Sequence, residues 1–235
     1  MTNDQKIALV TGGNRGIGFE LSKQLAENGF HVLLGCRDLE KGNAAAARLK
    51  VSNLNVAPVE LDVHNPDTLQ KAVRFVGEQY GRLDVLINNA GVFRDGNHSL
   101  IELPAGVLEG TMNTNFFGPY HMIRAFLPLM ERNNYGRIIN VSSGFGQMRE
   151  MRHPGHGSYK ISKYALNGLT QVLASEVSGN IKINAVCPGW VRTDMGGPNA
   201  PRSVEEAAQS ILWLTEIKED GPNGGFFRDG EEISW

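Results

Sequence analysis

The chain has 235 residues, a length that suits one α/β domain, and 41% hydrophobic residues make it too apolar for a disordered protein. Its formal net charge of −2 and its lack of a basic tract give nucleic-acid binding no electrostatic support. Two cysteines are too few for a disulfide framework or a Cys-rich metal site. No apolar run reaches the ~18–20 residues of a membrane span, and the N-terminus lacks signal-peptide features. We therefore expect a cytoplasmic protein with free thiols, no metal, and no membrane or nucleic-acid partner.

Short apolar strands alternate with amphipathic helices along most of the chain. The pattern predicts strands over 7–10, 31–35, 55–59, 83–87, 137–141 and 181–186. It predicts helices over 17–29, 38–50, 66–79, 104–132, 158–178 and 203–214. Such alternation is typical of βαβ units in a doubly wound parallel sheet with helices on both faces. Since the tail 224–235 has room for one edge strand, we expect about seven strands in a single domain spanning 1–235, with a functional loop over 188–203.

Glycine is unusually frequent, at 28 residues, and several glycines fall between the first strand and the first helix. This segment reads Thr11-Gly12-Gly13-Asn14-Arg15-Gly16-Ile17-Gly18. A Cβ atom here would hold a pyrophosphate away from the backbone, whereas the helix N-terminus supplies free N–H groups and partial positive charge. The segment therefore predicts a dinucleotide phosphate site. The alternative is a tight turn with a structural role only.

The spacing Thr-Gly-x-x-x-Gly-x-Gly resembles that of the short-chain dehydrogenase/reductase family, and further motifs follow in the family's order. They are Asp62-Val63, Asn88-Asn89-Ala90-Gly91, and Pro188-Gly189 with Thr193. The stretch 187–195 is most similar to the carbonyl reductase branch. The resemblance implies a Rossmann-type fold and an NADP(H) site. The residues expected to bind this cofactor are Gly12, Asn14, Arg15, Gly16, Ile17, Gly18, Arg37, Asp62, Val63, Asn89, Ala90, Gly91, Tyr159, Lys163, Pro188, Gly189, Val191 and Thr193.

The same resemblance implies a catalytic tetrad of Asn115, Ser143, Tyr159 and Lys163. Tyr159 and Lys163 are four residues apart, so they share a helix face. An ammonium ~4 Å from the phenol would lower its pKa by up to about three units, so we expect Tyr159 to titrate near working pH as a general acid. A chance Tyr-x-x-x-Lys pair on a solvated helix face is the alternative.

The other two members of the tetrad each have a competing interpretation. Ser143 would donate a hydrogen bond to the substrate oxygen, but its neighbour Ser142 could take that role, since adjacent strand residues point to opposite faces. Pro119 should break the predicted helix at Asn115, because it lacks an N–H and its ring clashes one turn back. In the family a water bound at such a break links this position to the lysine. Asn115 could instead merely cap the break.

The end of the second predicted strand bears on cofactor choice. Enzymes that use NAD usually place an acid there to bind the ribose 2′-hydroxyl. Here Cys36 and Arg37 follow the strand, and Arg15 lies in the glycine segment. Two guanidinium groups favour the 2′-phosphate of NADP, although both arginines could be ordinary surface charges and the nearby Asp38 could shift the register.

Residues on the substrate side should follow the fourth, fifth and sixth strands. The expected set, besides Ser143 and Tyr159, is Phe93, Phe145, Met148, Trp190 and Met195, any of which could instead be core. An apolar pocket indicates a lipophilic or aromatic carbonyl compound. His153 and His156 flank Pro154-Gly155 in the same region, but no cysteine or carboxylate pattern supports a metal pair there.

We therefore expect NADPH-dependent reduction of a carbonyl compound to the alcohol. A 3-oxoacyl carrier-protein reductase is the first alternative, because Arg149 and Arg152 could dock an acidic carrier protein. A non-catalytic NADP sensor and a flavodoxin-like binder are others, but sensors typically lack the tyrosine or lysine, and a flavodoxin-like site does not explain the tetrad. The helix 158–178 carries an ion-free outer stripe, so we expect a homotetramer or homodimer, unless the C-terminal tail covers that stripe.

Overall fold

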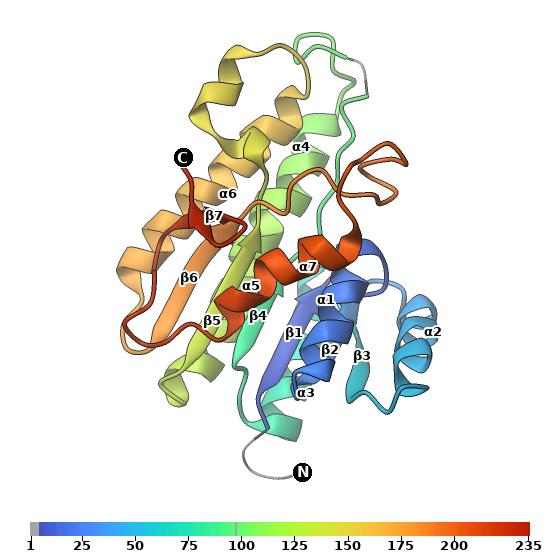
Figure 1. The fold of residues 1–235 in the computed structure, drawn as a ribbon, viewed down its shortest axis with the longest axis vertical. Helices are drawn as coiled ribbons and strands as arrows, with labels where there is room; N and C mark the ends of the chain where they lie inside the picture. The colour runs from blue at the N-terminus through green and yellow to red at the C-terminus, as the bar shows by residue number, and fades with distance from the viewer. Residues whose placement is uncertain (1–4, 97) are drawn as a thin grey trace.

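The computed structural model describes residues 5–96 and 98–235 and contains a central sheet flanked by helices (Figure 1). The strands are β1 (Ile7–Thr11), β2 (His31–Cys36), β3 (Val56–Glu60), β4 (Val85–Asn88), β5 (Gly136–Val141), β6 (Ile181–Val186), β7 (Phe226–Arg228) and β8 (Glu231–Glu232). They form one sheet in the order β3-β2-β1-β4-β5-β6-β7-β8, and every pair is parallel except β7 with β8. The predicted doubly wound fold is confirmed.

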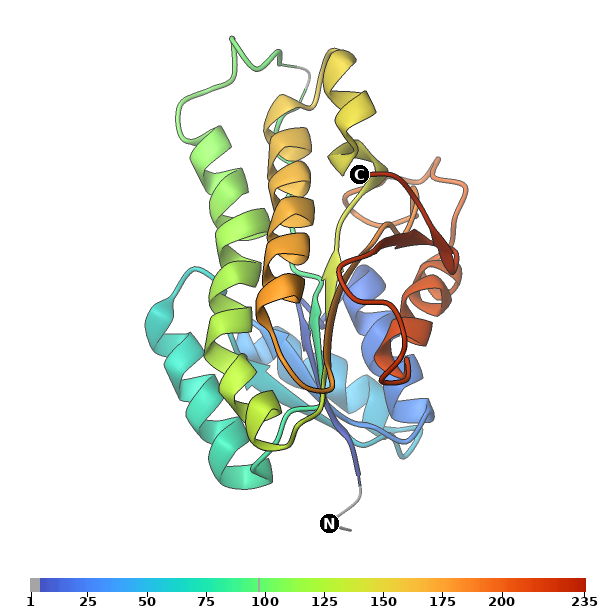
Figure 2. The ribbon, with the colours of Figure 1, turned by 90° about the vertical axis from the view of Figure 1, so that its left-hand side faces the viewer.

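Helices cover both faces of the sheet (Figure 2). They are α1 (Gly16–Glu27), α2 (Leu39–Lys50), α3 (Pro66–Tyr80), α4 (Val107–Met112), α5 (Gly118–Arg132), α6 (Gly157–Glu176) and α7 (Val204–Leu212). Residues of α1, α2 and α7 share one hydrophobic cluster with the sheet, and residues of α3, α5 and α6 share the other. Among the helices that the structure describes, none is both long enough and apolar enough to cross a bilayer.

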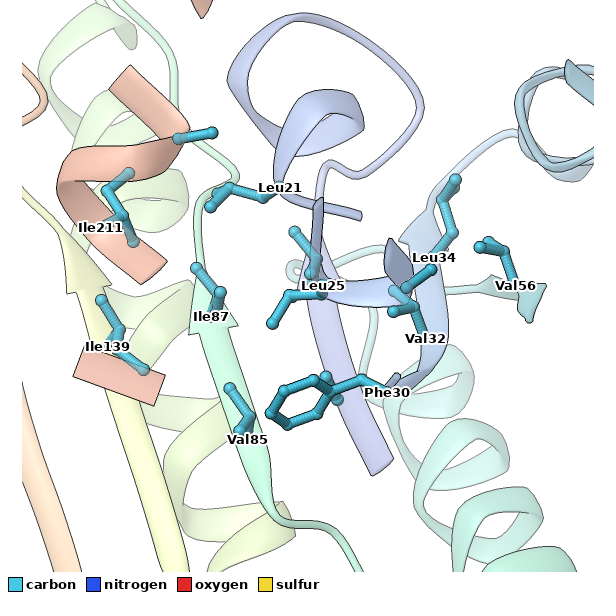
Figure 3. Packing of buried hydrophobic residues seen from close by; sticks show 14 of the residues in the cluster. Leu21, Leu25, Phe30, Val32, Leu34, Val56, Val85, Ile87, Ile139 and Ile211 are labelled. Carbon is cyan, nitrogen blue, oxygen red and sulfur yellow. The ribbon is translucent and has the colours of Figure 1, made fainter. Parts of the chain in front are cut away.

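The α1 face illustrates how the sequence pattern builds the core (Figure 3). Leu21 and Leu25 lie one turn apart on α1 and are fully buried against the sheet. Val10 on β1 pairs with Leu34 on β2 and Ile87 on β4, so a continuous apolar surface lies beneath that helix. Burying these side chains holds α1, and the loop that precedes it, against the carboxyl ends of the strands.

The strand count exceeds the expected seven, because the tail adds two strands rather than one. β7 extends the sheet in parallel beside β6, and β8 folds back antiparallel on β7. Asp229 and Gly230 form the turn with φ angles of 53° and 82°. An Asp-Gly pair is a recognised signal for such a turn, but strands of three and two residues carry too little alternation to be predicted.

The long helix expected over 104–132 is interrupted, as Pro119 predicted. A π-helical turn, η1 (Asn113–Phe117), separates α4 from α5. Gly118 donates its backbone N–H to the carbonyl of Asn113, five residues back. Pro119 has no N–H to donate, so the regular ladder cannot pass through this point.

Candidate active site

A cavity of about 1760 Å³ opens at the carboxyl ends of the strands. Its lining includes residues that directly follow six of them: Gly12, Arg37, Leu61, Asn89, Ser142 and Cys187. The strand order reverses direction at β1, and α/β sheets bind their ligands at such a switch point. The cavity exceeds the roughly 300–1,000 Å³ of ordinary small-molecule sites, so it has room for a dinucleotide and a second molecule.

The glycine segment forms the wall of this cavity beneath α1. Gly12 and Gly16 have φ angles of 64° and 53°, which residues with a side chain rarely adopt. A Cβ atom on Gly18 would lie 2.3 Å from the carbonyl oxygen of Gly12. The first turn of α1 also receives no side-chain cap. Its N–H groups therefore stay available, and the absence of side chains on these glycines lets a pyrophosphate come close to the backbone.

The two asparagines at the end of β4 hold the strand ends together, and Asn89 also supports the glycine segment. Asn89 donates its side-chain amide to the carbonyl oxygen of Thr11, at 2.9 Å. The backbone N–H groups of Asn89 and Ala90 donate to the Thr11 hydroxyl. Asn88 is buried and donates to Asn140 on β5. Asn89, Ala90 and Gly91 also line the cavity, as expected.

Three cationic side chains, Arg37, Arg15 and Lys41, line the cavity near the end of β2, and Lys41 pairs with Asp38 at 3.1 Å. Arg37 is exposed and lines the cavity, whereas the carboxylate of Asp38 caps α2 by accepting from the Lys41 backbone N–H. That hydrogen bond lowers the pKa of Asp38. Arg15 lines the same region and pairs with Asp194 at 2.7 Å, with both side chains exposed. Lys41 also lines this end of the cavity and was not predicted. The donor set fits a 2′-phosphate better than a free ribose hydroxyl.

Ser143, Tyr159 and Lys163 meet at the opposite end of the cavity. The Ser143 hydroxyl lies close enough to the Tyr159 phenol to lower the pKa of that phenol. The Lys163 ammonium lies 5.7 Å from the centre of the Tyr159 ring and donates to the carbonyl oxygen of Val141 at 2.8 Å. Ser142 instead is buried and donates to Asn167, so it does not compete for the position beside the phenol.

The expected pKa of Tyr159 is wrong for the protein without cofactor. Burial raises the pKa of Tyr159 to about 12, more than the hydrogen bond from Ser143 lowers it. Burial also lowers the pKa of Lys163 to about 8. The expectation treated the ammonium as the dominant influence, but loss of solvation around the phenolate outweighs it. Tyr159 is therefore a neutral phenol at pH 7, the form that a general acid requires.

Asn115 lies in the π-helical turn and is fully buried. Its side chain accepts from the backbone N–H of Val92 and donates to the carbonyl of Val92 and the hydroxyl of Ser162. It therefore joins the segment after β4 to α6, the helix that carries Tyr159 and Lys163. It does not line the cavity in the part of the chain that the structure describes. A Cβ atom on Gly91 would lie 3.4 Å from Asn115 Oδ1 and 3.6 Å from Lys163 Nζ, so Gly91 lies between the two side chains.

Most of the predicted substrate-side residues line the cavity, namely Phe93, Phe145, Trp190 and Met195. Met148 does not, and its side chain is 53% exposed. The segment Met148–Arg152 forms a 3-10 helix, and this turns Met148 outward while Gln147 and Arg149 line the cavity instead. The structure therefore does not place Met148 in the lining of the cavity.

The remaining predicted residues also line the cavity: Asn14, Ile17, Asp62, Val63, Pro188, Gly189, Val191 and Thr193. Sequence reasoning missed two polar lining residues near Tyr159. His156 is the N-cap residue of α6, and Arg228 comes from β7, where its guanidinium lies 3.0 Å from Cys187 Sγ. The pairing of β7 with β6 brings Arg228 to the cavity, and that pairing was not predicted.

Comparison with known proteins agrees with this geometry. The short chain dehydrogenase family model matches residues 6–203. Mouse carbonyl reductase [NADPH] 1 is 32% identical over 282 positions, covering 100% of both chains. Arabidopsis thaliana (+)-neomenthol dehydrogenase is 32% identical, covering 94% of this chain and 95% of the relative.

Solved structures give the same result. The carbonyl reductase Sniffer of Drosophila melanogaster superposes with a TM-score of 0.89 at 30% identity, covering 98% of this chain and 99% of that one. NADPH-bound carbonyl reductase from chicken fatty liver superposes with a TM-score of 0.87 at 31% identity, covering 98% and 99%. On its motifs, its fold and these matches, the chain is a member of the short-chain dehydrogenase/reductase family.

Proposed function

We propose that this chain is an NADPH-dependent carbonyl reductase that converts lipophilic ketones, aldehydes or quinones to alcohols. One observation carries the proposal: Tyr159, beside Ser143 and close to Lys163, lines a cavity with aromatic walls. The relatives named as NADPH carbonyl reductases, and the NADPH-bound chicken structure, support the cofactor and the reaction. NADPH, when bound, supplies the hydride.

The chain's own residues fit that cofactor at both ends. The glycine segment and the uncapped first turn of α1 would hold the pyrophosphate. Arg37 and Arg15 would bind the 2′-phosphate. Asp62 and Val63 would contact the adenine, and the loop 188–203 would cover the nicotinamide side. This loop is closed on itself by a bridge between Val191 and Arg202.

In the proposed reaction Tyr159 gives its proton to the carbonyl oxygen of the substrate. The phenol is protonated at pH 7 because its pKa is about 12. The Ser143 hydroxyl donates to the same oxygen and stabilises the charge that develops there. The Lys163 ammonium, held by the carbonyl of Val141, stabilises the phenolate that remains. Asn115 is a positioning residue, since it joins Val92 to the catalytic helix through Ser162.

The first prediction tests this function directly. We expect the protein to oxidise NADPH in the presence of aromatic ketones, aldehydes or quinones. Tyr159→Phe removes the phenol hydroxyl that acts as the acid and leaves the other expected NADPH contacts in place. Turnover should therefore fall by at least about 100-fold while NADPH binding is retained. The measurements are absorbance at the NADPH band and NADPH fluorescence titration. A Tyr159→Phe enzyme that keeps more than about a tenth of the rate would contradict the role of the phenol.

The same assay separates the alternatives. An acetoacetyl thioester reduced much faster than any free ketone would favour the 3-oxoacyl carrier-protein reductase. NADPH binding without turnover of any carbonyl compound would favour a sensor. We also propose that the enzyme is a cytoplasmic homo-oligomer. Its two cysteines, Cys36 and Cys187, are free and buried, which suits a reducing compartment.

A further inference from the structure

The catalytic helix begins at a histidine with an unusual backbone. His156 is the N-cap residue of α6 and has a φ of 60° and a ψ of 34°. Residues other than glycine rarely occupy this left-handed region, and holding one there strains the backbone. The His156 side chain does not cap the helix. The buried carboxylate of Asp95 does so instead, by accepting from the backbone N–H groups of Ser158 and Tyr159. The strain at His156 is therefore not explained by capping.

His156 belongs to a cluster of four rings around the catalytic phenol. Phe93 lies 4.9 Å from the His156 ring and 5.1 Å from the Tyr159 ring, between ring centres. Phe145 lies 5.4 Å and 6.4 Å from the same two rings. All four side chains line the cavity. Because the same two phenylalanines contact both polar rings, one small molecule between them can reach the imidazole and the phenol together.

The two nitrogens of the imidazole have different surroundings. Nδ1 is buried and has no hydrogen-bond partner. A buried N–H without an acceptor is rarer and more costly than a bare acceptor nitrogen, so the proton belongs on Nε2. Nε2 is then a hydrogen-bond donor on a ring that lines the cavity. A phenylalanine at this position would complete the ring cluster without leaving a polar atom unsatisfied, so packing alone does not call for histidine.

We propose that His156 is a specificity-determining residue that donates a hydrogen bond from Nε2 to a second oxygen of the carbonyl substrate. In this proposal the reacting carbonyl oxygen contacts Tyr159 and Ser143, and the second oxygen is on the neighbouring carbon of the substrate. This inference rests on the proposed reductase function and narrows its substrate class to carbonyl compounds that carry a neighbouring acceptor. His153, three residues earlier, is exposed and gives only its backbone carbonyl to Lys160, so it has no such role.

Two ketones that differ by one oxygen test the proposal. 1-Phenylpropane-1,2-dione carries the second acceptor, and 1-phenylpropan-1-one lacks it. The quantity measured is the ratio of kcat/KM for the dione to kcat/KM for the monoketone, with NADPH. A ratio cancels any effect of a substitution on Tyr159 that both substrates share. The variants are His156→Phe, which keeps a ring, His156→Asn, which keeps an N–H donor, and His153→Phe as the matched control.

We expect His156→Phe to lower the ratio about tenfold, the usual effect of losing one hydrogen bond. His156→Asn should restore part of the ratio, because asparagine accepts the left-handed backbone and offers an amide N–H. His153→Phe should leave the ratio at the wild-type value. If His156→Phe does not fold, His156→Gly removes the same side chain without backbone strain and should lower the ratio equally.

Three outcomes would overturn the inference. An unchanged ratio in His156→Phe or His156→Gly would show that the imidazole does not contact the second oxygen. An equal fall for both substrates would show that His156 only supports the fold around Tyr159. A wild-type protein that reduces neither ketone would refute the proposed function for this class and the inference with it, and this result is visible before any variant is made.

Discussion

Lys163 is buried and Tyr159 is half-buried, and loss of solvation shifts their pKa values in opposite directions. The pKa of Tyr159 is raised to about 12 and that of Lys163 is lowered to about 8, because each loses the solvation of its charged form. Between pH 6 and pH 8 the pair therefore consists of a neutral acid and a cation. This combination suits reduction, which takes a proton from the phenol and leaves a phenolate beside the ammonium.

The charge on Lys163 should set the upper pH limit of the reductase. Above a pH of about 8 the ammonium loses its proton, while Tyr159 stays protonated. We expect kcat/KM for the ketone to fall as the pH rises through this value. Lys163→Arg keeps the charge, since a guanidinium does not deprotonate in this range. The descending limb of the plot of kcat/KM against pH should therefore move to higher pH. Lys160→Arg, at a buried lysine that donates to a loop carbonyl, should leave the limb in place. A limb that stays near pH 8 in Lys163→Arg would contradict the assignment.

Arg37 should decide between the two dinucleotides. Its guanidinium lies at the end of β2, and the neighbouring carboxylate of Asp38 is engaged in capping α2. Arg37→Asp removes a charge-assisted hydrogen bond to the 2′-phosphate and places a carboxylate there. We expect kcat/KM for NADPH to fall by about tenfold or more and that for NADH to rise. A wild-type enzyme that already prefers NADH would show that the end of β2 was misinterpreted.

The sequence predicted those helices and strands whose bounds depend on neighbouring residues in the chain. Short apolar runs predicted six strands close to their observed bounds, because parallel strands are largely buried on both faces. Pro119 predicted the break between α4 and α5, since a missing N–H is a property of one residue.

Long-range packing produced the features that sequence reasoning missed. The hairpin β7–β8 is too short to show a period and depends on pairing with β6. The outward position of Met148 depends on how the segment between β5 and α6 folds over Gly146, whose Cβ would lie 2.9 Å from the Lys163 carbonyl. The pKa of Tyr159 depends on burial by side chains from several elements. None of these quantities is a property of neighbouring residues in the chain.

The C-terminal tail contacts several segments around the cavity. Arg228 approaches Cys187, and Asp229 pairs with Arg202 at the end of the loop 188–203. The side-chain amide of Gln147 donates to the backbone carbonyl of Ser234. The tail therefore braces the strand ends on which the cavity is built, but its contacts are on the side of β6 and β7.

The outer stripe of α6 consists of Ile161, Ala165, Gly168 and Val172, and the tail leaves it uncovered. Ile161 and Val172 are 38% and 54% exposed, and a Cβ atom on Gly168 would meet nothing within 4 Å. The tail was the alternative cover for this stripe, and these exposures contradict it. α5 runs beside α6 on the same face of the sheet (Figure 2), and Phe117 before it is 43% exposed. A helix face that is apolar and free of ions toward water usually packs on another surface.

We therefore expect two chains to pack α6 against α6, with Gly168 allowing close approach. Gly168→Arg should yield a monomer, because a guanidinium cannot be buried at such a contact without a partner, while helix propensity favours arginine over glycine in the free chain. Gln70→Arg, an equal charge change on an exposed position of α3, should leave the assembly intact. Sedimentation equilibrium at micromolar concentration measures both, and a wild-type protein found as a single species at the chain mass of 25.7 kDa would rule out the assembly.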